Sequence, residues 1–261
     1  MVTAAVVTAC AVFGLAVGSF LNVVIWRVPR GESVVRPVSH CPGCGAPVRP
    51  RDNVPVLSWL LLRARCRNCG VQISARYPLV ELGTGVVFAV LAARFGPAWA
   101  LPAFLYLAAV GIALAVIDWD TRRLPNALTL PSYAVGIALL AGAAAIDGSW
   151  SMLLRAALGM VALFGLYFAL AFIYPAGMGF GDVKLAGLLG LYLGWLGWGP
   201  WCVGAFAGFL LGAIGGGVVI ATRRGGRKTA IPFGPFMLAG ALVAILAGGP
   251  LVSAYLSLLG V

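Results

Sequence analysis

Long runs of apolar residues, separated by short polar segments, set the pattern of this chain. The first run, from Val2 to Trp26, holds no charged residue and ends directly before Arg27. About 20 consecutive apolar residues let a helix cross the hydrocarbon core of a bilayer. The pattern therefore predicts an all-α polytopic membrane protein with about eight transmembrane helices. The further predicted spans are Leu79 to Ala93, Ala98 to Ile117, Ala127 to Ile146, Met152 to Tyr174, Leu185 to Trp198, Trp201 to Ala221 and Ile231 to Leu259.

The composition agrees with this pattern. Hydrophobic residues make up 62% of the chain, charged residues 10%, and the mean hydropathy is +1.02. These values lie far from those of soluble globular proteins. The net charge of +11 would suit a nucleic-acid partner, but in a membrane protein the positions of Lys and Arg matter more than their sum. We therefore expect a lipid bilayer as partner and no nucleic acid.

The positions of the basic residues predict the orientation. When the eight spans are threaded alternately, 16 Lys and Arg residues fall on one side and only Arg94 and Arg155 on the other. Basic residues concentrate on the cytosolic side of membrane proteins, so both termini should face outward. No Lys or Arg precedes Arg27, which argues against a cleaved signal peptide. The cytosolic set comprises nine arginines between Arg27 and Arg76, then Arg122, Arg123, Lys184, Arg223, Arg224, Arg227 and Lys228.

The chain divides into three parts by composition. Residues 1–26 form the first transmembrane helix, residues 27–77 a polar, proline-rich cytosolic loop, and residues 78–261 the remaining membrane domain. Asp118, Asp120 and Asp182 then fall at the cytosolic ends of their spans. These acids come from distant parts of the sequence, and the topology places them at the same face of the membrane.

The loop carries two Cys-x-x-Cys pairs, Cys41 with Cys44 and Cys66 with Cys69. This spacing is typical of a zinc ribbon, in which four thiolates complete a tetrahedral site. Paired disulfides are the alternative, but they are rare in the reducing cytosol. Four protein ligands leave no open position, so the zinc should be structural. His40, the only histidine, is expected to be an exposed loop residue rather than a ligand.

The segment from Gly177 to Lys184 interrupts the apolar pattern with three glycines at alternate positions and Asp182. An acid beside apolar helices is costly and suggests a functional site. The alternative is that Asp182 only caps a helix beginning at Val183, since Asp is a preferred N-cap residue. The bare backbone near Gly179 and Gly181 would let an extended substrate strand pair with it. Lys184 would bind substrate or lipid phosphate, or only snorkel to the interface.

Asp118 is the expected partner of Asp182. Residues two apart do not share a helix face, so Asp118 and Asp120 cannot both fill this role, and Asp118 lies nearer the apolar span. Two carboxylates about 3 Å apart hold one proton between them. Such a pair can take a proton from water and give one to the carbonyl under attack. An interfacial loop anchored by Trp119 is the alternative for this segment.

These motifs together resemble the type IV prepilin peptidases, a family of intramembrane aspartic proteases. Asp118 with Leu124-Pro125-Asn126 and the G-x-G-D element Gly179-Phe180-Gly181-Asp182 carry the likeness. It extends over nearly the whole chain. Further matching elements are Gly18-Ser19-Phe20-Leu21-Asn22-Val23-Val24-Ile25, Arg27-Val28-Pro29, Cys41-Pro42-Gly43-Cys44, Asp52-Asn53-Val54-Pro55-Val56-Leu57-Ser58-Trp59, Cys66-Arg67-Asn68-Cys69, Tyr77-Pro78-Leu79-Val80-Glu81 and Pro232-Phe233-Gly234-Pro235-Phe236.

The resemblance implies a bifunctional enzyme of the bacterial inner membrane. Such enzymes cleave the short basic leader of type IV prepilins or type II secretion pseudopilins at the cytosolic face. They then methylate the new amino terminus with S-adenosylmethionine. The resemblance makes Asp118 and Asp182 the catalytic residues and ties the cysteine loop to methyl transfer. Where the family commonly has Gly two residues before the third cysteine, this chain has Ala64, which leaves a peptidase without methyl transfer as an alternative.

Two other classes of protein share some of these features. A proton-coupled transporter also combines intramembrane acids with glycine-broken helices, but transport needs acids along a path, and here they gather at one face. A membrane-anchored scaffold would use the zinc loop to dock a cytosolic partner and leave Asp118 and Asp182 dispensable. The sequence leaves open the individual substrate, the oligomeric state and the S-adenosylmethionine site, since it contains no glycine-rich Rossmann fingerprint.

Overall fold

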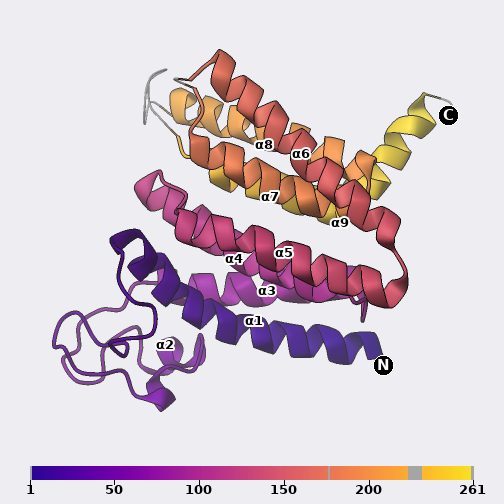
Figure 1. Cartoon of the computed structure of the whole chain (residues 1–261). Helices are drawn as coiled ribbons and strands as arrows, with labels where there is room; N and C mark the ends of the chain where they lie inside the picture. Colours follow the sequence, from indigo (N-terminus) through magenta and orange to yellow (C-terminus); the bar gives the residue numbers. More distant parts are fainter. Residues whose placement is uncertain (1, 176, 223–230, 260–261) are drawn as a thin grey trace. The chain divides into compact units, whose positions relative to one another are not determined.

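The computed structural model describes residues 2–175, 177–222 and 231–259, and this part of the chain is almost entirely helical (Figure 1). It contains two isolated β-bridges but no strand within those ranges. The basic residues expected between Arg223 and Lys228 lie outside the described residues. The helices are α1 (Val2–Arg27), α2 (Leu57–Leu61), α3 (Arg76–Phe95), α4 (Leu101–Thr121), α5 (Asn126–Asp147), α6 (Trp150–Ile173), α7 (Phe180–Leu196), α8 (Trp198–Ala221) and α9 (Gly234–Leu258), with 3-10 turns η1 (Val28–Arg30) and η2 (Pro50–Asp52).

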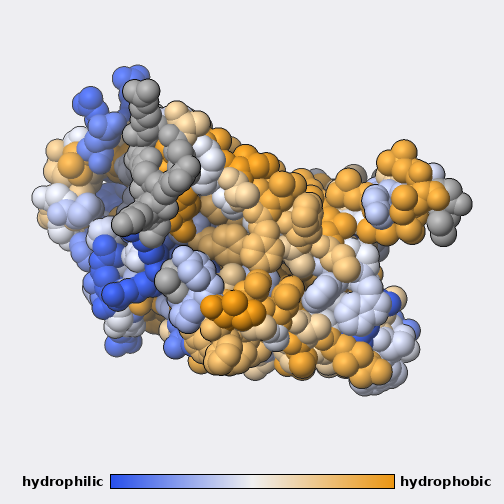
Figure 2. Space-filling model, turned by 90° about the horizontal axis from the view of Figure 1, so that it is seen from above, coloured by the Kyte–Doolittle hydropathy of each residue, from blue (hydrophilic) through white to orange (hydrophobic). Residues whose placement is uncertain are grey.

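The eight long helices fall on the eight apolar runs. Seven of them, within the described ranges, are long and apolar enough to cross a membrane. Large apolar side chains such as Phe13 and Phe172 are exposed, and apolar residues cover much of the visible surface (Figure 2). In water this exposure would be unfavourable, whereas lipid accepts it. The chain is therefore a multi-pass membrane protein.

The long helix that is not among these seven is α7, which the sequence predicts as the span from Leu185 to Trp198. It has 17 residues, of which 12 are buried. It begins at Phe180, earlier than the predicted Leu185, because Gly179 is its N-cap and Asp182 bonds back to the Gly179 N–H. Residues 180–184 are thus the first turn of a helix and not a separate loop.

The chain forms two compact units, Met1–Ala113 and Leu114–Val261, and the boundary lies within α4. In the first unit, α1 and α3 pack closely against each other because glycines lie at their contact. A Cβ on Gly14 would stand 2.9 Å from the Gly85 Cα, and one on Gly18 would stand 2.6 Å from the Glu81 Cα. Small residues at helix interfaces in membranes allow such close approach. The packing presses Glu81 of α3 against α1.

In the second unit, α7 packs closely against α6. A Cβ on Gly190 would stand 2.4 Å from the Gly159 carbonyl oxygen, and one on Gly194 would stand 2.7 Å from that of Arg155. The Arg155 guanidinium also donates to the carbonyls of Gly194 and Trp195, each at 2.8 Å. These bonds satisfy carbonyl groups that a helix end leaves unpaired. Because α7 is held along its length and at its end, its first turn has a fixed place in the unit.

Candidate active site and metal centre

Asp118 lies near the end of α4 and is buried, with 5% of its surface exposed. Its Oδ2 accepts a hydrogen bond from the Gly234 backbone N–H at 3.0 Å. Gly234 is the first residue of α9, and the first N–H groups of a helix have no partner within the helix. The start of α9 therefore supplies a donor to the Asp118 carboxylate. Sequence reasoning had assigned no role to this glycine.

Asp182 lies in the first turn of α7 and is partly buried. Its Oδ2 accepts the N–H of Gly179 at 3.2 Å. The alternative, in which Asp182 is the N-cap of a helix beginning at Val183, is wrong in its position, because Gly179 is the N-cap and Asp182 is the third helical residue, bonding back to it. Asp118 and Asp182 are also near enough to interact electrostatically. Both belong to the second unit, where Leu124 borders Gly181 beside Asp182 and Gly234 beside Asp118.

Leu124 packs against Gly181 and Gly234, the glycines next to the two acids. A Cβ on Gly181 would stand 3.1 Å from the Leu124 Cβ, and one on Gly234 would stand 3.4 Å from its Cδ2 and 2.8 Å from the Asp118 Oδ2. No larger residue fits at either glycine without moving its neighbour. Gly181 is needed here for this close contact in the first turn of a helix, where the sequence had suggested an extended backbone.

Lys184 lies two residues after Asp182 in α7, and its side chain is held by neighbouring residues. Its Nζ donates to the Asn126 Oδ1 at 2.8 Å and lies 4.9 Å from the centre of the Phe180 ring. The Tyr133 hydroxyl donates to the Lys184 backbone carbonyl. These contacts join α7 to the start of α5. The Lys184 ammonium is thus positioned beside the site by a partner that sequence reasoning did not identify.

The short connection after α4 explains how Leu124 and Asn126 reach α7. Arg122 has φ of 54°, a left-handed conformation that ends helices and that usually favours glycine. Its N–H donates to the Asp118 carbonyl at 2.8 Å. The chain turns there, and the preceding Trp119 and Asp120 are exposed while Asp118 is buried. The motif Leu124-Pro125-Asn126, quoted from the sequence without a role, lies along the site for this reason.

The four loop cysteines gather in the first unit. Their Sγ atoms all lie within 4.8 Å of one another, and those of Cys41 and Cys69 are 3.7 Å apart. A tetrahedral site with Zn–S bonds of about 2.3 Å requires sulfurs roughly 3.8 Å apart, so the cluster fits a metal ion. All four thiols are free, which removes the disulfide alternative. His40 lies outside this group and is exposed.

The two cysteine pairs have the same local structure. In each pair the first cysteine's carbonyl accepts the N–H of the glycine after the second cysteine, Gly45 at 2.8 Å and Gly70 at 2.9 Å. Both glycines are left-handed, with φ of 69° and 71°, a conformation that glycine adopts without steric cost. Backbone N–H groups of Cys69 and Asn68 lower the pKa of the Cys66 thiol to about 6. The thiolate, which binds metals, is therefore favoured at neutral pH.

An ion pair closes this loop on itself. The Arg67 guanidinium binds the Asp52 carboxylate with a shortest N–O distance of 2.6 Å, and two further contacts between them measure 3.0 Å. The Arg67 hydrogen bond holds the pKa of the Asp52 carboxyl below its usual value. This contact joins the 3-10 turn η2 to the second cysteine pair, and so stabilises the loop around the metal cluster.

The chain matches known proteins over most of its length. Residues 12–95 match the Bacterial Peptidase A24 N-terminal domain, and residues 103–252 match the Type IV leader peptidase family. The chain belongs to the type IV leader peptidase family. The predicted resemblance is thereby confirmed. No solved structure matches the chain.

Several bacterial members of the family are similar over long stretches and share the name prepilin leader peptidase/N-methyltransferase. The protein of Myxococcus xanthus (strain DK1622) is 43% identical over 225 residues, which cover 84% of this chain and 64% of that protein. The protein of Aeromonas hydrophila is 36% identical over 272 residues, covering 94% and 92%. The protein of Neisseria gonorrhoeae is 40% identical over 213 residues, covering 70% and 73%. The match thus spans less than two thirds of the Myxococcus relative and most of the Aeromonas relative.

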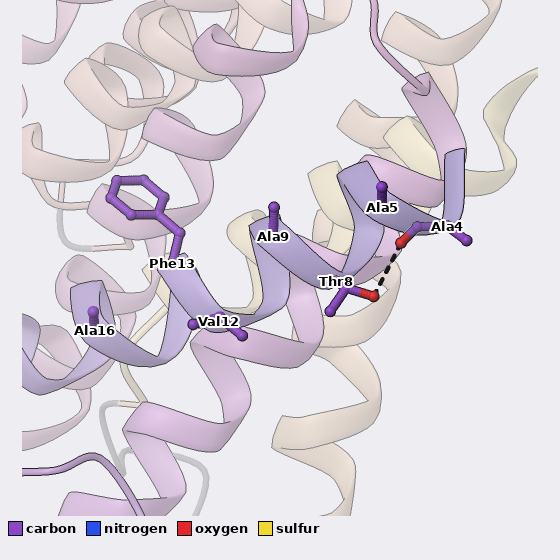
Figure 3. Close-up of a pocket in the computed structure, with 7 residues that line it drawn as sticks. All are labelled: Ala4, Ala5, Thr8, Ala9, Val12, Phe13 and Ala16. Atoms are coloured by element: carbon purple, nitrogen blue, oxygen red, sulfur yellow. Dashed lines mark hydrogen bonds between the residues drawn. The ribbon is translucent and has the colours of Figure 1, made fainter. Parts of the chain in front are cut away.

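A hollow on the first helix takes no part in the candidate site. Figure 3 shows the residues that line it, all of them in the N-terminal half of α1. Among the lining residues only Thr8 has a polar side chain, and its hydroxyl already donates to the Ala4 carbonyl at 3.0 Å. These residues offer no metal ligand and no nucleophile beyond that hydroxyl. The lining residues are Ala4, Ala5, Thr8, Ala9, Val12, Phe13 and Ala16.

Proposed function

We propose that this chain removes the short leader from type IV prepilins or pseudopilins and then methylates the new amino terminus. The names of its relatives state both activities for those proteins. The observation that carries the peptidase half is the meeting of Asp118 and Asp182 within one unit, each held by a backbone N–H. Family membership leaves the transporter and the scaffold without support.

The two aspartates form the catalytic dyad of this proposal. Two neighbouring carboxylates do not both ionise readily, so the pair holds one proton. The ionised member takes a proton from a water molecule as that water attacks the scissile carbonyl carbon. The protonated member gives its proton to the carbonyl oxygen. The tetrahedral species then releases the leaving amine as the proton returns through the pair.

The backbone donors orient this dyad. The bonds from Gly234 and Gly179 go to the Oδ2 atom of Asp118 and of Asp182, respectively. The Oδ1 atoms are thereby left for the shared proton and the attacking water. Rigid positioning of catalytic groups accounts for a large part of enzymatic rate enhancement. Leu124, packed against Gly181 and Gly234, keeps the two helix starts at a fixed separation.

The substrate is proposed to enter from the bilayer, with its leader on the cytosolic side. The apolar segment of the substrate lies in the bilayer beside the transmembrane helices, whose outer faces are also apolar. Lys184, held by Asn126, stands beside the dyad and binds substrate or lipid phosphate. The proposed orientation puts the termini outside and the site at the cytosolic face of the inner membrane. The proposed division of the chain stays at residues 1–26, 27–77 and 78–261.

Two further groups belong to the proposal. Cys41, Cys44, Cys66 and Cys69 hold one structural Zn²⁺, since four thiolates suit zinc and leave no open position. S-adenosylmethionine supplies an electrophilic methyl group when it is bound. The described residues hold no strand followed by a glycine-rich turn, so we assign no residues of this chain to the donor itself.

Substitution of the acids tests the peptidase half. Wild type, Asp118→Asn, Asp182→Asn and the matched control Asp120→Asn are assayed in liposomes for cleavage of a short-leader prepilin. Loss of the titrating group should lower the rate at least roughly a hundredfold for Asp118 and Asp182. Asp120→Asn, at an exposed position of the same helix, should retain the rate. Full activity of either dyad variant would refute the proposed mechanism.

A further inference from the structure

The first unit contains a buried acid that the cleavage mechanism does not use. Glu81 lies in the second turn of α3 and is 8% exposed. Its Oε2 accepts the Val56 backbone N–H at 2.7 Å, and the Ser19 hydroxyl also donates to its carboxylate. A carboxylate in such a place is costly unless it is paired. Its partners are both neutral, so the charge itself is not balanced by them.

No cation of the described chain provides that balance. Among the described residues, no Lys or Arg forms an ion pair with Glu81. An ionised carboxylate offers about four acceptor positions, and the donors from Val56 and Ser19 fill two of them. A cationic donor from outside the chain would find the remaining two. The site therefore has the negative charge and the acceptor capacity to take an ammonium group.

Three segments of the chain fix the Glu81 carboxylate in place. The close packing of Gly18 brings α1 against the Glu81 backbone. The Asn22 side chain of α1 donates to the Tyr77 carbonyl at the start of α3, at 3.1 Å. On the loop side, Val56 has φ of 62°, which is costly for a β-branched residue. That conformation directs its N–H to Glu81.

We infer that Glu81 binds the α-ammonium group of the cleaved pilin and prepares it for methyl transfer. The inference rests on the proposed function, whose second reaction acts on this ammonium group. Glu81 accepts one proton from the ammonium, which becomes a neutral amine. The nitrogen lone pair then forms a bond to the methyl carbon of the sulfonium donor. The carbon–sulfur bond breaks with its electron pair going to sulfur, giving a methylated ammonium and a neutral thioether.

Peptide binding in the absence of a methyl donor tests this assignment. The probes are a peptide with the sequence of the mature pilin N-terminus and the same peptide with its amine acetylated. Affinities are measured for the full chain in nanodiscs of phosphatidylglycerol, which has no amine. Wild type should prefer the free amine by about tenfold or more, as expected of a charge-assisted hydrogen bond. Glu81→Gln, nearly isosteric and still able to accept the Val56 N–H, should bind both peptides equally.

A matched control separates this role from a general effect on the loop. Asp52→Asn removes the other described carboxylate that fixes the loop, by breaking the Arg67 ion pair. It should keep the preference for the free amine. Leader cleavage and zinc content, measured on each variant, show that the protein is folded. If Glu81→Gln does not fold, Glu81→Asp replaces it, and the shorter acid should reduce the preference.

The outcomes are distinct. A wild type without a preference for the free amine, or a Glu81 variant that keeps the full preference, overturns the inference. If such a wild type still cleaves and methylates a prepilin, the proposed function stands without it. A wild type that cleaves but never methylates refutes the methyl-transfer half and the inference together. Phosphatidylethanolamine added to the nanodiscs tests for a lipid ammonium, and abolition of the peptide preference by this lipid would assign the site to lipid instead.

Discussion

Gly234 donates its backbone N–H to the Asp118 Oδ2 at 3.0 Å, although 116 positions separate the two residues. The bond joins the start of α9 to the end of α4 beside the proposed dyad. It requires a glycine, since a Cβ at this position would stand 2.8 Å from the same oxygen. One residue thus provides both the donor and the space for the carboxylate of the proposed dyad.

Replacing this glycine should disable cleavage without unfolding the helices. In Gly234→Ala the added methyl group displaces the Asp118 carboxylate, and misplacement of a catalytic group by about 1 Å can cost roughly a hundredfold in rate. The measurement is the initial rate of prepilin cleavage. Gly249→Ala on the same helix is the control, because nothing lies within 4 Å of its added Cβ. Equal rates for the two variants would show that the contact is unimportant.

The pair of Lys184 and Asn126 should be energetically coupled. Its hydrogen bond of 2.8 Å has a charged donor, and such bonds contribute about 1.5–3 kcal/mol when well formed. Because Lys184 is partly exposed, we expect a coupling below this range, about 1 kcal/mol. A double-mutant cycle of Lys184→Met and Asn126→Ala, read by thermal unfolding and by cleavage rate, measures it. Additive effects of the two substitutions would contradict the interaction.

Removal of the metal should unfold the cysteine loop and leave the second unit folded. Structural zinc contributes directly to folding where the surrounding core is small. Purified protein should contain about one zinc per chain, and a strong chelator or Cys41→Ser should release it and expose the loop to protease. Cys202→Ser, at a cysteine on α8 that is not one of the four, should retain the metal. A loop equally resistant to protease before and after chelation would argue against a structural metal.

The residue that departs from the family pattern should be a point of strain. Ala64 has φ of 58°, a conformation that costs a non-glycine residue about 1 kcal/mol. Ala64→Gly should therefore stabilise the loop by about that amount, seen as slower proteolysis, and raise the methylation rate if the loop serves that reaction. Ala75→Gly is the control, since Ala75 has φ of −62° and gains nothing from glycine. A less stable Ala64→Gly variant would contradict this account.

The sequence predicted much of the fold because hydrophobic length alone determines where a membrane helix can form. All eight runs became helices, and the two cysteine pairs met in one cluster. The preference for Asp118 over Asp120 also agrees with their burial, which follows from helical geometry. Such features depend on local patterns of residue type, which a single sequence displays directly.

Other features depend on contacts between distant segments, and these the sequence could not provide. The Pro232–Phe236 motif does not indicate that Gly234 donates to Asp118. Likewise, the sequence around Val56 does not indicate that its N–H donates to Glu81. The start of α7 was missed because glycines usually weaken helices. Here Gly181 is retained in the first turn because Leu124 leaves no room for a side chain.

The burial of α7 has a consequence for how the protein is made. A helix with 12 of its 17 residues buried presents little surface to lipid. Gly190 and Gly194 lie against the backbone of α6, so α7 can take its place only once α6 is present. We therefore expect α7 to insert stably only together with its neighbours. The proposed dyad is therefore complete only once α7 has packed against α6.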